Sequence, residues 1–189
     1  MLMVRRALSL LIAMTVLLGI GYPLAITAIA QVAFPYQANG SLIERDGKLI
    51  GSRLIGQSFS DPKYFWGRPS ATTPQPYNGV ASSGSNLGPL NPALIDGVKA
   101  NVKMLRDADP DNREPVPVEL VTASASGLDP EIGPAAARYQ LGRVARARGI
   151  PTDRIEALIA AHTEPRTLGF IGEPRINVLE LNLALDSLH

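Results

Sequence analysis

A few serine, histidine and aspartate side chains are the residues of this sequence that could do chemistry. Residues 84–88, G-S-N-L-G, have the composition of a phosphate-binding loop, and His162 could meet Ser126 and Asp129 in a nucleophile, base and acid arrangement. Neither pattern has the required spacing, because no G-x-x-x-x-G-K-[ST] run and no G-x-S-x-G run occurs. We therefore predict a structural turn at 84–88, a helix-capping role for His162, and no catalytic or cofactor-binding residue.

Metal and nucleic-acid binding find no support in the composition. The two histidines, His162 and His189, lack H-E-x-x-H spacing, and the absence of cysteine excludes disulfides, a thiolate nucleophile and Cys-ligated zinc. The 18 basic and 17 acidic residues nearly balance, and two of the basic ones, Arg5 and Arg6, lie at the N-terminus. We predict no metal site and no nucleic-acid partner.

Four arginines form a cluster along one predicted helix, two of them in its last turn: Arg138, Arg143, Arg146 and Arg148. Basic side chains in the last turn of a helix interact favourably with its dipole, and a charge run of this kind is usually a solvated face. A contact with anionic lipid or with an acidic partner is the alternative. We expect the solvated face.

Residues 7–34 form an apolar stretch without a charged side chain, directly after Arg5 and Arg6. A helix of about 28 residues reaches roughly 40 Å, enough to cross a hydrocarbon core of about 30 Å. A cleaved signal peptide is the alternative, since residues 28–30 form an A-x-A pattern, but signal peptides have apolar regions of only about 7 to 15 residues. We predict a retained membrane span.

Gly19 and Pro23 are the candidate partner contacts within this span. Pro23 lacks the N–H that would bond to the carbonyl of Gly19, so we expect a kink, and small residues let a neighbouring helix approach closely. A helix merely bent in lipid is the alternative. Positive charge before the span predicts residues 1–6 as a cytoplasmic tail, 7–34 as the transmembrane helix and 35–189 as one mixed α/β domain outside the cytoplasm.

The first half of this domain combines a hairpin signal with a long loop. Asp46 and Gly47 between short apolar runs predict a β-hairpin over residues 42–50, and a further strand is expected over 52–59. Residues 61–90 are rich in Pro, Gly, Ser and Asn, which predicts a loop, although its aromatic residues indicate that part of it packs.

The second half reads as helices with one intervening strand. Asn91 and Pro92 open a helix that should end near Asp107, and a strand is expected over 116–123. Further helices are predicted over 130–148, capped by Asp129, and through Ala161, capped by Thr152 or Asp153. Residues 176–188 alternate like a strand, but their composition favours a helix capped by Asn177. The fold class is α/β, of the α+β kind, anchored by one N-terminal transmembrane helix.

The chain resembles the C subunit of the bacterial Kdp potassium-transporting ATPase along its whole length. The resemblance rests on the single span and on a set of motifs: 55–59 I-G-Q-S-F, 64–71 Y-F-W-G-R-P-S-A, 84–91 G-S-N-L-G-P-L-N, 120–130 L-V-T-A-S-A-S-G-L-D-P, 162–164 H-T-E and 172–185 G-E-P-R-I-N-V-L-E-L-N-L-A-L. It implies a non-catalytic accessory subunit, and no D-K-T-G-T phosphorylation motif occurs in this chain.

The resemblance also implies partners and a location. The partners would be a channel-like potassium-binding subunit, a P-type ATP-hydrolysing subunit and a small single-span subunit, in a bacterial inner membrane with the soluble domain in the periplasm. ATP and potassium would be used by the complex, with no cofactor bound by this chain, and its presence would stabilise assembly and raise the pump's apparent ATP affinity.

Five residues in the soluble domain join Gly19 and Pro23 as candidate partner contacts: Arg68, Ser85, Asn86, Asp129 and Asn177. All five lie in motifs that carry the resemblance. A membrane-anchored exported hydrolase or a small-ligand-binding protein remains the alternative function, motivated by the Gly- and Ser-rich loops and by His162.

Overall fold

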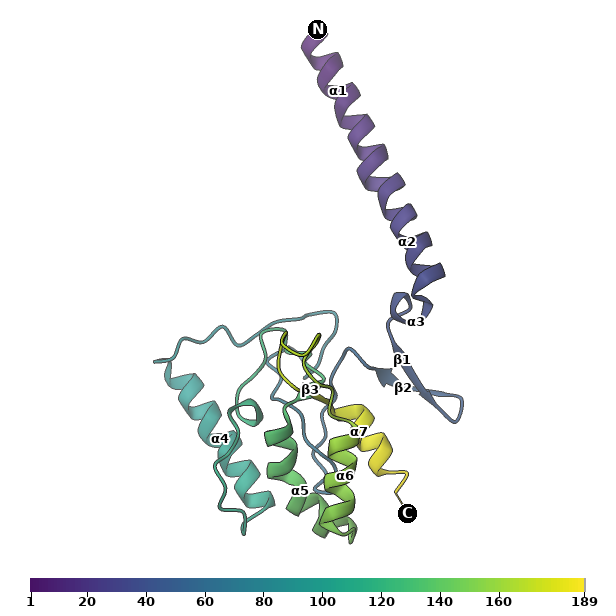
Figure 1. Cartoon of the computed structure of the whole chain (residues 1–189). Coiled ribbons are helices and arrows are strands. Elements are labelled where there is room, and N and C mark those ends of the chain that lie inside the picture. Colours follow the sequence, from purple (N-terminus) through teal and green to yellow (C-terminus); the bar gives the residue numbers. More distant parts are fainter. Residues whose placement is uncertain (189) are drawn as a thin grey trace. The chain divides into compact units, whose positions relative to one another are not determined.

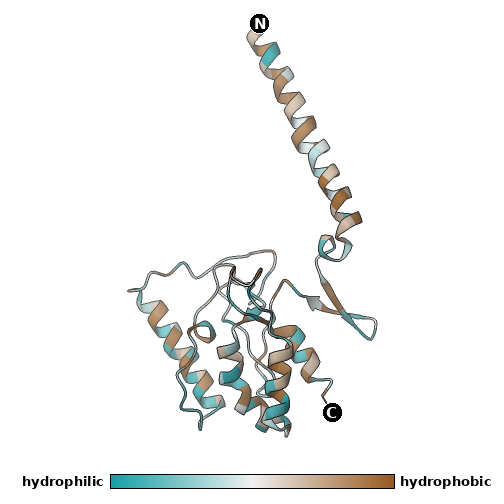
Figure 2. Ribbon diagram, viewed as in Figure 1, coloured by the Kyte–Doolittle hydropathy of each residue, from teal (hydrophilic) through white to brown (hydrophobic). Residues whose placement is uncertain are grey.

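The computed structural model describes residues 1–188 and divides into two compact units, Met1–Ser52 and Arg53–His189. The first unit holds an apolar helix that runs without a break from Leu2 to Ala33 (Figures 1 and 2). None of its residues is buried within the protein. Its length and composition are those of a membrane span, which agrees with the predicted N-terminal anchor.

Pro23 is accommodated by a change of helix type. The run consists of α1 (Leu2–Met14), a π-helical stretch η1 (Thr15–Gly21) and α2 (Tyr22–Ala33). The π-helical turns end two residues before the proline that cannot donate a backbone hydrogen bond. The disturbance predicted at Pro23 therefore appears as a widened stretch of an otherwise continuous helix.

A short helix and a hairpin complete the first unit. After α3 (Pro35–Ala38), strands β1 (Leu42–Arg45) and β2 (Lys48–Ser52) pair antiparallel. Asp46 and Gly47 both have positive φ, at 53° and 70°, as a tight two-residue hairpin turn requires, so the predicted hairpin is confirmed.

The predicted strand over residues 52–59 is wrong. Strand β2 ends at Ser52, and residues 53–59 belong to no sheet. Gly56 N donates instead to Leu128 O at 2.9 Å, a single loop-to-loop bond. The apolar residues of this stretch serve loop packing, which a period-two pattern cannot distinguish from a strand.

The second unit begins with the long loop that was predicted. Residues 61–90 contain no helix or strand, yet Phe65 and Trp66 are buried in the core, at 0 % and 7 % exposure. Helix α4 (Pro92–Ala108) follows, and Asn91 caps it by accepting a bond from Ala93 N at 2.9 Å. Its predicted start is confirmed and its end lies one residue later than expected.

The strand predicted over 116–123 is also wrong. This segment holds only a single 3₁₀ turn, η2 (Val118–Leu120). Pro115 and Pro117 lack the N–H donors that a strand would need, while Leu120 and Val121 are buried and account for the apolar pattern.

Two very short strands lie between the remaining helices: β3 (Glu131–Ile132) pairs antiparallel with β4 (Ile176–Asn177). Helix α5 (Pro134–Arg148) starts after β3 with Gly133 as its cap and ends at Gly149, whose φ is 65°. Asp129 is therefore not the cap that was predicted. Its Oδ1 accepts a bond from Glu131 N at 3.0 Å, which turns the chain into β3.

The last two helices form where the sequence predicted them, but the second is shorter than the predicted stretch 176–188. Helix α6 (Thr152–Ala161) has Pro151 at its cap position, so neither Thr152 nor Asp153 caps it as expected. Helix α7 (Val178–Leu185) is capped by Asn177, which accepts a bond from Glu180 N at 3.1 Å, and the helical prediction is confirmed. The strand-like pattern holds only for Ile176–Asn177.

The core gathers residues from α5, α6, α7 and the loop segment 65–66, joined by single residues of α4, η2 and the strands. Its fully buried members include Phe65, Ile132, Val144, Ile155, Ile159, Ile176, Leu181 and Leu185. The domain is thus mixed helix and strand, with helices predominating. Helix α4 lies at its edge (Figure 1), and only Leu105 of its apolar stripe is buried.

Candidate functional site

The motif Y-F-W-G-R-P-S-A is fixed to the helices by two buried side-chain amides. Asn182 of α7 accepts from Phe65 N and donates to Phe65 O, both at 2.9 Å. Gln140 of α5 does the same to Trp66, at 2.8 and 3.0 Å. Two consecutive residues of an irregular loop thereby satisfy their buried backbone groups without any strand partner.

Arg143 of α5 reinforces the same attachment. Its guanidinium donates to Pro62 O at 2.5 Å, to Tyr64 O at 3.1 Å and to Gln140 Oε1 at 2.6 Å, and lies 4.1 Å from the centre of the Trp66 ring. Burial lowers the pKa of Arg143 to about 10, so the side chain stays charged at neutral pH. A buried cation is tolerated here because carbonyl oxygens and a ring face surround it.

The interpretation of the four arginines as one solvated face is therefore wrong. Arg143 is 4 % exposed, and Arg148 is held by Asp186 at 2.7 Å and by Lys63 O at 2.7 Å. Only Arg138 and Arg146 have mostly exposed side chains, and each pairs with a carboxylate, of Glu156 and Asp109 respectively. Long basic side chains near a helix end can reach backbone carbonyls of a neighbouring loop, which no charge pattern reveals.

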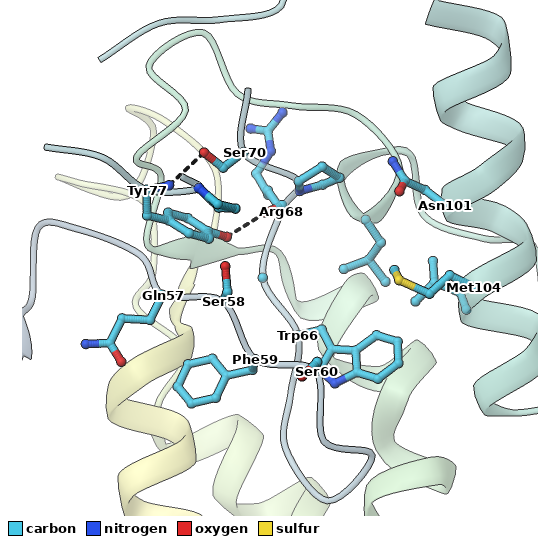
Figure 3. A pocket seen from close by; sticks show the side chains of 15 residues that line it. Gln57, Ser58, Phe59, Ser60, Trp66, Arg68, Ser70, Tyr77, Asn101 and Met104 are labelled. Atoms are coloured by element: carbon cyan, nitrogen blue, oxygen red, sulfur yellow. Dashed lines mark hydrogen bonds between the residues drawn. The ribbon is translucent and has the colours of Figure 1, made fainter. Parts of the chain in front are cut away.

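Two of the candidate contact residues, Arg68 and Asp129, are brought together by the fold. Arg68 Nη1 lies 3.0 Å from Asp129 Oδ2, in a half-buried pair. Tyr77 Oη donates to the backbone oxygen of Arg68 at 2.5 Å, and Ser70 Oγ accepts from Tyr77 N at 2.9 Å (Figure 3). The ion pair between Arg68 and Asp129 joins the motif at 64–71 to the motif that ends at Pro130.

Close backbone contacts interlock the same motifs. A Cβ on Gly127 would lie 2.5 Å from Ser83 O and 2.6 Å from Thr72 Cγ2, and a Cβ on Gly56 would lie 2.4 Å from Tyr77 Cε1. Ser83 N also donates to Ser126 O at 2.9 Å. Gly56 and Gly127 are thus required where loops distant in sequence touch.

The glycine-rich run does not form a phosphate cradle. Gly84 lies against the backbone of Ala125, where a Cβ would come within 2.9 Å of its carbonyl oxygen. Ser85 and Asn86 are exposed, and Asn86 has a φ of 53°, so these two candidate contacts lie on the surface of the loop. The structural-turn interpretation fits this geometry.

Asn177 has an internal position. It is 5 % exposed, its Oδ1 caps α7 and its Nδ2 donates to Arg53 O at 2.8 Å. Gly19 and Pro23 lie in the apolar helix, Gly19 in its π-helical stretch and Pro23 in the first turn of α2. The structure thus gives Asn177 a capping role, and contact with a partner stays a prediction for all seven residues.

His162 ends α6, and its Nδ1 lies 2.9 Å from Leu158 O. This is the carbonyl-capping position predicted for it. Ser126 Oγ accepts from Leu128 N at 3.1 Å, and within residues 1–188 no hydrogen bond joins His162 to Ser126 or Asp129. The geometry offers no support for a hydrolytic triad; His189 lies outside the described residues.

A cavity of about 380 Å³ opens between the loop and α4 (Figure 3). Apolar side chains dominate its wall, with a polar margin: Phe59, Trp66, Met104, Leu105 and Leu120 beside Ser58 and Asn101. A second, charged cleft of about 520 Å³ has Arg68, Glu119, Asp129, Glu131, Glu173 and Arg175 in its wall. In the described part of the chain no group of three potential ligands is placed to hold a metal ion.

Electrostatics in the charged cleft is shaped by burial. Burial raises the pKa of Glu131, opposed by Arg175 at 2.9 Å and assisted by the nearby carboxylates of Asp129 and Glu164. Arg175 also pairs with Glu164 at 2.9 Å. Two ion pairs, Arg68–Asp129 and Glu131–Arg175, therefore lie within the cleft, and Glu119 accepts from Gly133 N at 2.9 Å.

Tyr77 gives this region a measurable pH dependence. Burial, assisted by the charge of Asp129, raises the pKa of Tyr77 to about 12. The folded state then binds the phenolic proton more tightly than the unfolded state, so stability is lost as pH rises from about 10 to about 12, by roughly 2 kcal/mol. In Tyr77→Phe we expect this loss to be absent, with about 1 kcal/mol less stability at neutral pH because the bond to Arg68 O is missing.

The measurement is urea unfolding of the full chain in detergent at pH 8 to 12, followed by the fluorescence of its single tryptophan, Trp66. Tyr36→Phe, which alters an exposed ring, should follow the wild type. Equal alkaline slopes for Tyr77→Phe and wild type would contradict the prediction.

Sequence reasoning missed the roles of the residues that organise this region. Gln140, Arg143 and Asn182 lie on helices whose pattern indicated only which faces are apolar. One signal was present: Gln140 and Asn182 occur among the apolar positions of their helices, where a polar residue is buried only if it is hydrogen-bonded.

Known proteins share the sequence of this chain over nearly its whole length. Residues 4–187 match the family described as KdpC: K+-transporting ATPase, c chain. The chain belongs to the KdpC family. It is 60% identical over 186 residues to the potassium-transporting ATPase KdpC subunit of Dechloromonas aromatica (strain RCB), covering 98% of this chain and 97% of that relative.

Other KdpC subunits are equally similar. The subunit of Polaromonas naphthalenivorans (strain CJ2) is 62% identical over 184 residues, covering 97% of this chain and 94% of that protein. The subunit of Sorangium cellulosum (strain So ce56) is 62% identical over 182 residues and 96% of both chains. The chain is thus the accessory, non-catalytic c chain of a potassium-transporting ATPase, and the hydrolase alternative is not favoured.

Proposed function

We propose that this KdpC chain works as a membrane-anchored assembly subunit, acting by contact with its partners and not by chemistry of its own. One observation carries the proposal: the buried polar side chains of Gln140, Arg143 and Asn182 are all engaged in holding the loop 62–66, which leads into the motif at 64–71, to the helices. A domain whose distinctive residues build its own surface loops is suited to present that surface to other proteins.

The proposed partners are a channel-like potassium-binding subunit, a P-type ATP-hydrolysing subunit and a small single-span subunit. In this proposal Gly19 and Pro23 face partner spans, because small residues and a π-helical stretch allow close helix approach. Ser85 and Asn86, exposed on the loop, are the strongest of the soluble-domain candidates, and the loop would lie over the potassium entrance.

The proposed topology has residues 1–6 in the cytoplasm, 7–34 across the inner membrane and the folded domain in the periplasm. It is supported by Arg5 and Arg6 before the span. With the domain there, any increase in the pump's ATP affinity would pass through the partner subunits.

Omission of the chain tests the function. The complex is expressed with and without this subunit, purified in detergent, and assayed for potassium-stimulated ATP hydrolysis and ATP KM. We expect the assembly to dissociate and stimulated activity to fall at least about tenfold when the chain is absent, as for loss of an interface worth 1.4 kcal/mol or more. A stable, fully active complex without it would refute the assembly role.

A cysteine scan tests the topology, since the chain has no cysteine of its own. Asp111→Cys places a thiol at an exposed loop position, and Ala7→Cys places one at the cytoplasmic end of the proposed span. In intact cells a membrane-impermeant reagent should label the first and spare the second. The reverse pattern would put the domain in the cytoplasm.

A further inference from the structure

An apolar loop tip is the feature of the soluble domain that the assembly role leaves unexplained. Residues 164–175 form a narrow projection, closed at its base by the bridge between Glu164 and Arg175 and near its end by the bridge between Thr167 and Ile171. Three large apolar side chains lie at its end: Leu168, Phe170 and Ile171 are 78 %, 72 % and 51 % exposed. We call this group the apolar tip.

The backbone at the tip makes the choice of residues informative. Leu168 has a φ of 55° and precedes Gly169 at 85°, so the turn needs left-handed conformations at both. Glycine, asparagine and aspartate adopt that region readily, whereas leucine does so rarely. A solvent-exposed turn has no folding reason to place leucine there, which points to a binding role for the apolar side chain.

The base of the projection lies where the second unit begins. Arg53, the first residue of that unit, pairs with Glu164 and, at 3.0 Å, with Glu180. Glu164 also pairs with Arg175 across the base of the projection. The apolar tip therefore extends from the point at which the chain arrives from the membrane anchor.

That point is held close to the end of the anchor. Ser52 Oγ donates to Gly40 O at 2.7 Å and Ser52 pairs with Leu42 across the hairpin, so the hairpin leaves where it starts and adds no length. Only residues 34–40 separate the helix end from this junction, a reach of at most about 25 Å. Phe34 and Tyr36 are exposed and follow the helix directly, and aromatic side chains at the end of a span prefer the membrane–water interface.

We propose that the apolar tip inserts into the interfacial layer of the lipid bilayer, giving the domain a second membrane contact. The projection extends roughly 15 Å beyond its base, enough to return to a surface that the tether holds nearby. Three side chains on a turn are far below the roughly 800 Å² per partner of a stable protein interface, whereas insertion into lipid needs no complementary surface. The inference rests on the proposed membrane anchoring but not on which side the domain occupies.

Tryptophan fluorescence tests the proposal, because the native Trp66 is buried and supplies a constant background. Phe170→Trp places a reporter at the tip, and Val118→Trp is the matched control on η2, where the native valine is 71 % exposed. Each full chain is reconstituted alone into phosphatidylethanolamine and phosphatidylglycerol vesicles, with and without brominated acyl chains, and flotation is checked first.

We expect Phe170→Trp to show blue-shifted emission and loss of the added fluorescence in brominated vesicles, with no change for Val118→Trp. Quenching of both variants, or of neither, would overturn the proposal. A tip that becomes shielded only in the assembled complex would assign it to a protein partner instead. Failure of the wild-type chain to float with vesicles would refute the anchoring itself, and the tip contact with it.

Discussion

Replacing Gln140 with leucine is expected to destabilise the domain by about 3 kcal/mol, because it leaves buried backbone groups without hydrogen-bond partners. Gln140 is 1 % exposed, accepts from Trp66 N at 2.8 Å and donates to Trp66 O at 3.0 Å. Leucine has nearly the same volume but can pair with neither group, and it also removes the acceptor of Arg143. Each unsatisfied buried group costs roughly 1 to 3 kcal/mol.

Thermal unfolding of the full chain, followed by Trp66 emission, measures this loss at the affected residue itself. For a domain of this size, 3 kcal/mol corresponds to a fall in Tm of about 10 °C. Gln75→Leu makes the same chemical change on an exposed loop side chain and should move Tm by little. If the two variants melt together, the amide of Gln140 does not hold the loop.

Replacing Gly127 with alanine is expected to cost about 3 kcal/mol, from two separate sources. Its φ of 66° disfavours any Cβ, and that Cβ would lie 2.5 Å from Ser83 O and 2.6 Å from Thr72 Cγ2. Loops that interlock at this point must then separate, so the surface built by the motifs should loosen along with the fold.

Gly149→Ala isolates the conformational part of this cost. Gly149 has nearly the same φ, 65°, but nothing lies within 4 Å of its Cβ position. This variant should lose only about 1 kcal/mol. Urea unfolding of both variants gives the difference, which is the energy of the close contact; equal losses would mean that Ser83 and Thr72 move aside freely.

Features of the fold that depend on residues close in sequence were predicted correctly, whereas features that depend on distant segments were not. The hairpin at Asp46 and Gly47, the start of α4 at Asn91 and the cap of α7 at Asn177 were all predicted, since each depends on hydrogen bonds between residues a few positions apart. The strands expected over 52–59 and 116–123 failed because apolar spacing does not reveal whether a partner strand exists.

The same contrast applies to the candidate site. Arg68 and Asp129 were each singled out from separate motifs, but their pairing across 61 residues became visible only in the fold. The burial of Arg143 could not be predicted, because its hydrogen-bond acceptors are carbonyl oxygens of a loop about 80 residues away in the sequence. Charge patterns reveal only residues close in sequence, whereas the groups that contact Arg143 come close to it only in the folded chain.

The amino-acid sequence by itself determined the apolar anchor, the local turns and caps, and membership of the family, because hydropathy, capping and motifs are properties of contiguous residues. The tertiary structure alone decided which motifs meet, that amides of Gln140 and Asn182 replace a strand partner, and that Leu168 and Phe170 remain uncovered. Those outcomes depend on contacts between segments distant in the chain, where packing and desolvation select one arrangement among many that the local pattern allows.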